Sequence, residues 1–183
     1  MQDGDSVDAS REKAAQRLKK DEISRDNLRR LVDHWEALRT PNGLPARQDV
    51  RPEDLRFILP QIMLVDVHYR PSAAPVPAEF TFRFRLVGTR IEETGHPGLQ
   101  GHWAHELNPL PYRRLVLQAY CEAVREATPN FYRLALDHAG QQLRYERVTL
   151  PLAGDGRMID TLLVGTDWDP VNDDFFRVYP AIG

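Results

Sequence analysis

The stretch from residue 80 to residue 87 alternates apolar and polar side chains, and it constrains the fold more than any other part of the chain. Phenylalanine or leucine stands at each even position, and threonine or arginine stands at most of the odd ones. A period of two predicts a β-strand with one face on a core and the other mostly in water. Beyond this strand the chain is interrupted by Gly88, Gly95, Pro97, Gly98 and Gly101. Any helices before Leu107 are therefore expected to be short and separated by turns.

Length and composition indicate one ordinary globular domain with an extension. The chain has 183 residues, of which 42% are hydrophobic and 28% are charged, and no run of about 18 apolar residues offers a membrane span. The first residues lack the basic and apolar regions of a secretory signal, so we expect a cytoplasmic protein. A net charge of -3 gives no general attraction to nucleic acid or to anionic membranes, and neither is expected as a partner.

The chain contains a single cysteine, Cys121. One cysteine excludes an internal disulfide and any metal site made only of cysteines within one chain. Cys121 lies in a helical pattern, where a free thiol usually packs as a small hydrophobe. We therefore expect a buried, inert thiol rather than a reactive one.

The N-terminal part of the chain is predicted to be a disordered tail followed by a long helix. Residues 1–10 are acidic and almost without apolar side chains, which is typical of disorder. Residues 11–43 have a helical pattern that ends at a Pro-Asn-Gly turn, and their apolar stripe consists of Leu28, Leu31, Trp35 and Leu38. This stripe can pack on its own domain or on a second copy of the chain, and we predict that it contributes to a homodimer interface.

The rest of the chain is predicted to form an α+β domain from residue 44 to residue 168. A short helix follows Pro52, and the first strand, 61–69, forms a hairpin with the strand at 80–87 across a proline-rich loop. A helix is expected at 112–127. Three further strands, separated by hairpin turns, are expected at 131–137, 142–152 and 157–168. The extension at 169–183 has no strong period, although its aromatic residues are suited to covering an edge or a neighbouring chain.

Four local motifs resemble those of the PAS domain family, and in particular a small, stand-alone subfamily common in alphaproteobacteria. They are L-P-A-R-Q-D-V-R-P-E-D-L at 44–55, L-P-Q-I-M-L-V-D-V at 59–67, F-R-F-R-L-V-G-T at 82–89 and R-Y-E-R-V-T-L-P-L at 144–152. The resemblance implies a five-stranded antiparallel sheet of order 2-1-5-4-3, with short helices on one face. It also implies a sensory and dimerisation module whose concave face either holds a small ligand or is packed shut.

The sequence departs from two specialised types of PAS domain. Residues 90–107 contain no cysteine, which excludes a flavin–cysteine adduct. No kinase or cyclase output module is expected after Trp168.

Aromatic residues with polar tips are the candidates for lining a ligand pocket. The predicted set is Phe82, Phe84, His102, Trp103, Tyr112, Tyr120, Tyr132 and Tyr145. Ordinary core packing is the alternative. The strands also carry five arginines, Arg83, Arg85, Arg133, Arg144 and Arg147, and two of them facing the pocket would bind a carboxylate or a phosphate bidentately. A solvated sheet face is the alternative for these arginines.

His102 and His105 are the best candidates for metal chemistry. If their segment is helical, the two histidines share a face, with His96 nearby as a third ligand. The spacing does not match the H-E-x-x-H motif of metalloproteases. We therefore expect polar packing at the mouth of the pocket, and neither a metal site nor haem ligation through His102 or His105.

No nucleophile elbow, phosphate loop, dinucleotide fingerprint or catalytic triad is recognisable in the sequence. We therefore predict a non-catalytic sensory or protein-interaction module, with a small ligand or a signalling protein as its partner. The alternative is a small-molecule enzyme that uses a buried pair such as Asp66 and Tyr145, or the two histidines, in the same cavity.

Overall fold

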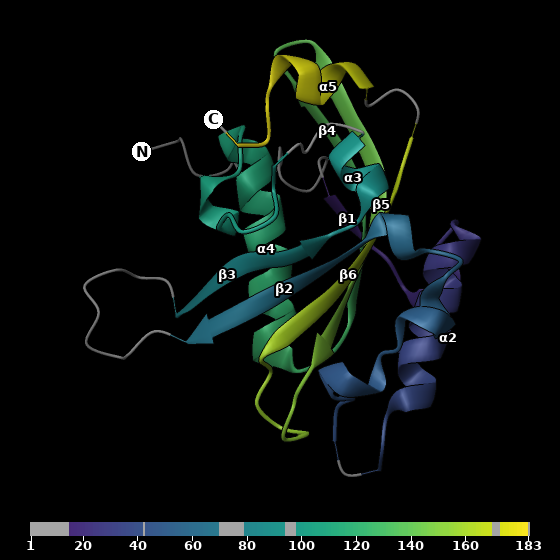
Figure 1. Cartoon of the computed structure of the whole chain (residues 1–183). Helices are drawn as coiled ribbons and strands as arrows, with labels where there is room; N and C mark the ends of the chain where they lie inside the picture. The colour runs from purple at the N-terminus through teal and green to yellow at the C-terminus, as the bar shows by residue number, and fades with distance from the viewer. Residues whose placement is uncertain (1–14, 42, 70–78, 94–97, 170–172, 183) are drawn as a thin grey trace, which may run out of the picture.

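The computed structural model describes residues 15–41, 43–69, 79–93, 98–169 and 173–182 (Figure 1). The predicted tail at 1–10 and the proline-rich loop lie outside these residues. The strands are β1 (Ala15–Arg17), β2 (Ile62–Tyr69), β3 (Phe80–Val87), β4 (Asn130–His138), β5 (Gln141–Leu152) and β6 (Thr161–Trp168). The α-helices are α2 (Asp26–Leu38), α3 (Thr89–Glu93), α4 (Leu110–Glu126) and α5 (Asp173–Val178). The 3-10 helices are η1 (Lys20–Glu22), η2 (Arg47–Asp49), η3 (Pro52–Leu55), η4 (Leu59–Gln61) and η5 (Ala104–Glu106).

The strands form one antiparallel sheet in the order β1-β4-β5-β6-β2-β3. Counted along the chain, the five predicted strands lie in the order 2-1-5-4-3, which confirms the predicted arrangement. The sheet has one more strand than predicted, because Ala15–Arg17 pairs with Leu134, Arg133 and Tyr132 of β4. The α+β class is confirmed as well.

The single long helix predicted for residues 11–43 is wrong. Among the described residues of this range, the chain forms β1, then η1, and becomes α-helical only from Asp26 to Leu38. The backbone N–H groups of Ser24 and Arg25 donate hydrogen bonds to the carboxylate of Glu146 in β5. This attachment to the sheet holds the residues before Asp26 in an extended conformation, so helix formation starts later than the sequence pattern indicates.

The last strand begins at Thr161, four residues later than the predicted residue 157. The Asp155 carboxylate accepts hydrogen bonds from the backbone N–H groups of Arg157 and Met158 at 2.8 and 2.7 Å. These bonds keep the segment after Asp155 in a turn.

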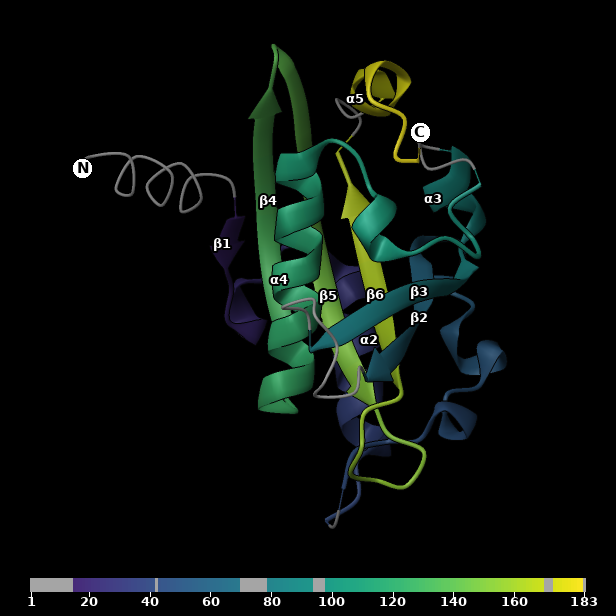
Figure 2. The ribbon, with the colours of Figure 1, turned by 90° about the vertical axis from the view of Figure 1, so that its left-hand side faces the viewer.

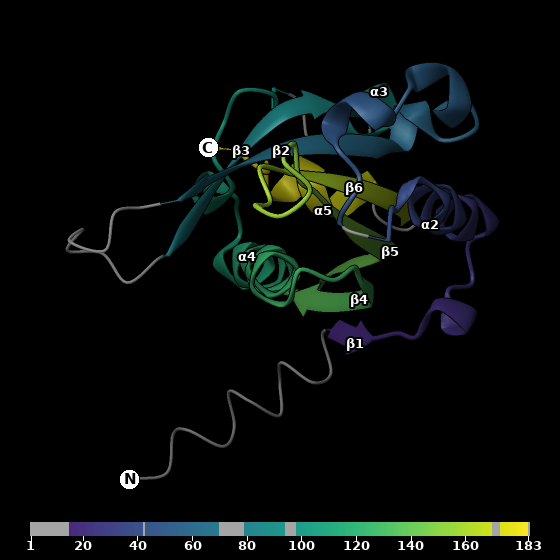
Figure 3. The same cartoon turned by 90° about the horizontal axis from the view of Figure 1, so that it is seen from below.

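Helix α2 covers one face of the sheet, and its apolar stripe is buried within the chain (Figure 3). The exposed fractions of Leu28, Leu31 and Trp35 are 0–1%, and Leu38 is half-buried. The stripe packs against the apolar outer residues of β5 and β6, among them Leu150 and Leu163. It therefore packs on its own domain, which was the alternative to a dimer interface. Its three buried side chains are not available to a second copy.

Helix α4 covers the opposite face of the sheet, where it packs against β4 and β5 (Figures 2 and 3). Its buried residues recur at spacings of three and four and give the helix one apolar face. They are Tyr112, Leu115, Val116, Ala119, Tyr120, Ala123 and Val124. The helix ends at Ala127, whose backbone is left-handed, immediately before Thr128 and Pro129. The concave space between α4 and the sheet holds the larger apolar core.

The C-terminal segment closes one end of this core. Phe175 and Phe176 of α5 are 0 and 3% exposed, and the Phe176 ring lies 5.5 Å from that of Trp168 in β6. The extension thus covers its own chain rather than presenting these two rings to a neighbour. No helix in the described part of the chain is long and apolar enough to cross a membrane.

Candidate functional site

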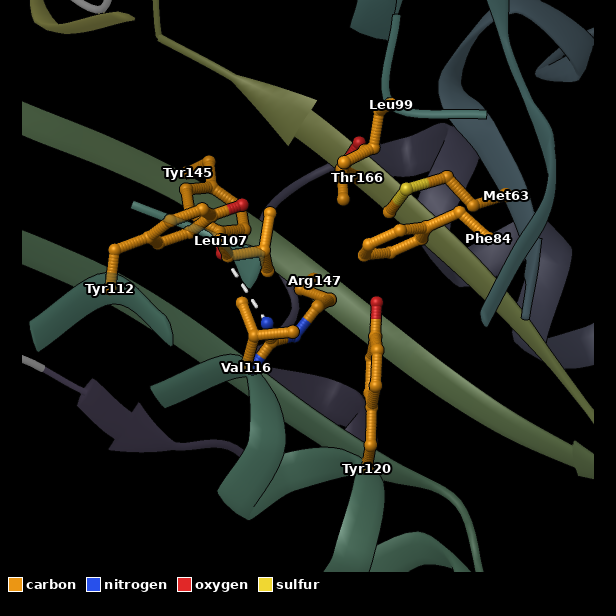
Figure 4. A pocket seen from close by; sticks show the side chains of 10 residues that line it. All are labelled: Met63, Phe84, Leu99, Leu107, Tyr112, Val116, Tyr120, Tyr145, Arg147 and Thr166. Carbon is orange, nitrogen blue, oxygen red and sulfur yellow. Dashed lines mark hydrogen bonds between the residues drawn. The ribbon is translucent and has the colours of Figure 1, made fainter. Parts of the chain in front are cut away.

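A small cavity lies between α4 and the sheet, and we name it the Arg147 cavity (Figure 4). Its volume is about 10 Å³, which is room for about one water molecule. Three of its walls are regular elements, namely α4, the strands β2 and β3, and the strands β5 and β6. The fourth wall is the segment around η5. The lining residues are Met63, Phe84, Leu99, Leu107, Tyr112, Val116, Tyr120, Tyr145, Arg147 and Thr166.

Among the described residues, Arg147 is the one charged residue that lines this cavity. The residue is 3% exposed. One terminal nitrogen, Nη2, donates a hydrogen bond to the carbonyl of Leu115 at 3.2 Å, and Nη1 donates to the Tyr145 hydroxyl at 3.4 Å. The buried Nε has no acceptor among the residues that the structure describes. Within the described residues, none of the ion pairs closer than 4.0 Å involves Arg147.

Three tyrosine hydroxyls surround this guanidinium. Burial raises the pKa of the Tyr112, Tyr120 and Tyr145 hydroxyls, so all three stay protonated and neutral near pH 7. The Tyr112 and Tyr145 hydroxyls are hydrogen-bonded to each other. The Arg147 guanidinium lies 5.7 Å from the Tyr120 ring centre and 6.0 Å from that of Tyr145, which is cation–π distance. Neutral aromatic groups thus offset part of the cost of burying this cation.

The Arg147 cavity has a polar end and an apolar end. Tyr112 and Tyr145 lie on one side of Arg147, and Met63 and Phe84 lie on the other, where the Tyr120 hydroxyl points towards Phe84 (Figure 4). The arrangement suits a small molecule that has a polar head and an apolar remainder.

The structure separates the predicted pocket residues into three groups. Phe84, Tyr112, Tyr120 and Tyr145 line the Arg147 cavity. Phe82 lies behind it, with its ring 5.3 Å from that of Tyr120.

The other three predicted residues lie elsewhere. Tyr132 donates its hydroxyl hydrogen bond to Glu122 on the outer side of α4. His102 and Trp103 run beside the edge of β3, where Trp103 forms a bridge with Arg83 and its ring contacts that of His68 at 5.1 Å. Neither of these two residues lines the cavity.

His102 and His105 do not share a helix face. The 3-10 helix η5 begins at Ala104, so His102 precedes it and pairs with Glu106, its Nδ1 lying 3.4 Å from the carboxylate. His105 instead stacks on Trp103 at 6.1 Å. His96 lies outside the described residues. No group of three His, Cys, Asp or Glu side chains in the described ranges is placed to hold a metal ion.

Of the five arginines on the strands, Arg147 alone lines the cavity. Arg83 donates to the carbonyl of Gly101, Arg85 pairs with Asp66, and Arg144 pairs with Asp137. Arg133 pairs with Glu146 on the opposite face of the sheet.

A second hollow, of about 110 Å³, lies beside the Arg133–Glu146 pair. Its other charged residues include Arg25 and Asp169, which are paired with each other. The charges around this second hollow thus largely neutralise one another.

The alternative catalytic pair, Asp66 and Tyr145, is not brought together. Asp66 is opposite Thr161, and Thr161 is opposite Leu152 of β5. Tyr145 lies seven residues before Leu152 on the same strand, which corresponds to about 23 Å along it. Asp66 instead pairs with Arg85 at 2.6 Å. An enzyme that uses these two residues together is incompatible with the fold.

In a comparison with protein-family models, residues 23–164 match a family described as PAS domain. The match covers more than half of the chain, from the residues just before α2 into β6. The chain belongs to the PAS domain family. PAS domains serve as sensory or interaction modules. In this PAS domain, β1 and α5 lie outside the matched residues and add to the family's sheet and core. Comparison with curated proteins and with solved structures gave no significant match.

Proposed function

We propose that this PAS domain is a non-catalytic sensory module whose input is a small molecule bound in the Arg147 cavity. The observation that carries the proposal is the burial of Arg147, which is 3% exposed and whose Nε lacks an acceptor in the described part of the chain. Burying a cation costs several kcal/mol unless it is paired and hydrogen-bonded, and a group left unsatisfied inside a domain points to a missing partner.

Binding is expected to move the wall of the cavity. A space of about 10 Å³ is too small for a metabolite, so side chains must give way. Met63, Leu99 and Leu107 are unbranched at Cβ and can change rotamer at low cost.

A displacement of Leu107 would be transmitted through hydrogen bonds to α4 and to the C-terminal segment. The carbonyl of Leu107 accepts a hydrogen bond from Arg113 Nε of α4 at 2.6 Å, and the next residue, Asn108, donates its N–H to the carbonyl of Ala181 at 2.8 Å. One wall of the cavity is thus bonded both to α4 and to the C-terminal segment. We propose that a partner protein reads the ligand state at this end of the molecule.

We also propose that the domain forms a homodimer, as PAS domains commonly mediate self-association. Since Leu28, Leu31 and Trp35 are buried within one chain, the interface must use other surfaces. Sedimentation velocity at tens of micromolar tests this, and a monomer at that concentration would contradict it.

The ligand proposal is tested by native mass spectrometry and by thermal shifts against a library of neutral, cationic and anionic small molecules. Val116→Phe fills the cavity from α4, and Val178→Phe makes the same substitution at a site that is 49% exposed. At least one compound should stabilise the wild type and Val178→Phe but not Val116→Phe. Ligand responses that are equal in all three proteins would contradict binding in the Arg147 cavity.

A further inference from the structure

The hydrogen-bonding capacity of Arg147 is only partly used. A guanidinium has five N–H donors in a planar fork, and acceptors are present for two of them, the Leu115 carbonyl and the Tyr145 hydroxyl. The Nε donor is buried and has no acceptor in the described structure. The missing partner must therefore be a hydrogen-bond acceptor, and an anionic acceptor gives the strongest interaction with this fork.

The charge of the cavity limits the charge of its ligand. Arg147 supplies one positive charge, and every other polar group at the cavity, namely the three tyrosine hydroxyls and Thr166, is neutral. A monoanion would neutralise the site. A dianion such as phosphate would leave one uncompensated negative charge in a closed space, which is costly.

Thr166 is not a free donor for that ligand. Its hydroxyl accepts a hydrogen bond from Trp168 Nε1 at 2.9 Å and lies 3.4 Å from the carbonyl of Gln61. The Tyr112 and Tyr145 hydroxyls are hydrogen-bonded to each other, so the Tyr120 hydroxyl, which points towards Phe84, is the further donor that a ligand can use (Figure 4). The polar groups available to a ligand are therefore the Arg147 guanidinium and neutral hydroxyl groups. This set matches a ligand with a single small, planar, anionic group.

The apolar end indicates a carbon chain rather than an inorganic ion. Five of the ten lining residues are apolar, and two of them, Met63 and Phe84, occupy the side away from Tyr112 and Tyr145 (Figure 4). From these features we infer that the Arg147 cavity binds a short-chain monocarboxylate, with its carboxylate on Arg147 and its tail towards Met63 and Phe84. This inference rests on the proposed function, since it names the chemical class of the ligand for the same cavity.

The test measures the thermal stability of the full chain with sodium formate, acetate, propionate and butyrate. The reference at each ionic strength is the sodium salt of HEPES, whose sulfonate anion is far too large for the site. Acetamide and propionamide are the neutral counterparts of acetate and propionate, with the same shape. Any ligand that binds only the folded state raises the melting temperature with its concentration, from which a dissociation constant follows.

Three arginine variants locate the response. Arg147→Met keeps most of the side-chain volume and removes the charge, and Arg147→Lys keeps the charge but lacks the fork. Arg144→Met is the matched control, because Arg144 lies on the same strand and faces the second hollow. Acetate or propionate should stabilise the wild type and Arg144→Met. The affinity should fall at least about tenfold in Arg147→Met, and less in Arg147→Lys.

The outcomes separate this inference from the proposed function. If the amides stabilise the wild type as strongly as the carboxylates, and Val116→Phe abolishes the response while Arg147→Met keeps it, the cavity binds a neutral ligand and the inference is wrong. If no carboxylate stabilises the wild type, the inference is likewise overturned, while the proposed function is decided by the wider library. If the carboxylate response is lost in Arg144→Met alone, the anion binds at the second hollow, and the inference fails for that reason. Should Arg147→Met not fold, Arg147→Lys decides between these outcomes, and an undiminished response in it would contradict a role for the fork.

Discussion

The side chain of Glu146 holds Ser24, 122 positions earlier in the chain, against the outer face of the sheet. Its carboxylate accepts hydrogen bonds from the Ser24 N–H at 2.9 Å and from the Ser24 hydroxyl at 2.8 Å. Arg133 of β4 donates to the same carboxylate from two nitrogens, at 2.9 and 2.7 Å. Glu146 is 3% exposed, so it acts as the buried acceptor that fixes the start of α2 to the sheet.

Replacing Glu146 with Gln should destabilise the PAS domain by about 1–3 kcal/mol at pH 7, because charge-assisted hydrogen bonds are lost and Arg133 loses its partner. Urea unfolding measures this. The control is Glu36→Gln, which removes an exposed ion pair with Lys20 and should cost no more than about 1 kcal/mol. Equal stability of the two variants would show that Glu146 does not anchor α2.

The same variant should change how stability depends on pH. Burial acts to raise the pKa of the Glu146 carboxyl, but hydrogen bonds from Arg133 and Ser24 outweigh it and hold the pKa below its ordinary value of 4.5. The unfolded chain therefore binds this proton more readily than the folded one. The stabilisation is complete above about pH 5 and is lost as the pH falls through the folded pKa. The stability difference between wild type and Glu146→Gln should thus shrink as the pH falls below about 5, and a constant difference would contradict this account.

The sheet was predictable from local patterns, because its signals lie within single segments. The alternation at 80–87 gave β3 with its observed bounds, and the hairpin turns gave the order of the last three strands. The partner of the α2 stripe was not predictable. Leu31 is buried by β5 and β6, more than 100 positions away, and its pattern is the same whether it packs there or on a second chain. Likewise, the three residues of β1 are too few to show a period.

The candidate site was only partly predictable, because it too depends on contacts between residues that are distant in sequence. The aromatic residues at the cavity were identifiable by type, but Arg147 was one of five arginines with the same local signal. Alternation places Arg147 on the same side of β5 as Tyr145, yet β5 is covered on both faces, by α4 and α2, so alternation alone does not show which face borders a cavity. Leu99 and Leu107 come from irregular segments, and no periodicity indicates their positions.

Leu31→Ala should destabilise the domain by about 2–5 kcal/mol, since it leaves a void between α2 and the sheet. Leu38→Ala, at the half-buried end of the same helix, is the matched control and should cost clearly less. Chemical denaturation with both variants at one temperature measures the difference. If Leu38→Ala proved the more costly change, the observed packing of α2 would be wrong.

The thiol of Cys121 should react slowly in the folded protein. Cys121 is half-buried, and burial raises the pKa of its thiol. At neutral pH the folded protein therefore contains less of the reactive thiolate than the unfolded chain does. Alkylation by iodoacetamide should therefore be slower under native conditions than in denaturant at the same pH. Equal rates would show that Cys121 is open to solvent.

Gly165 of β6 lies directly against Leu28 and Leu31 of α2, and alanine there should destabilise the domain by about 1–3 kcal/mol. An added Cβ would lie 2.6 Å from Leu31 Cδ2 and 3.1 Å from Leu28 Cδ2 and Val148 Cγ2. Gly154→Ala is the matched control, because its Cβ would meet only the flexible carboxylate of Asp160, at 2.9 Å.

The cause of the Gly165 effect can be isolated with Leu31→Ala. Shortening Leu31 removes the nearest obstructing atom, so Gly165→Ala should cost less in the Leu31→Ala background than in the wild type. The coupling should be about 0.5–3 kcal/mol, as is usual for residues in contact. Denaturant unfolding of the wild type, the two single variants and the double variant provides the cycle. Strictly additive effects would mean that the side chain of Leu31 does not limit the space at Gly165, and that another contact sets the distance between α2 and β6.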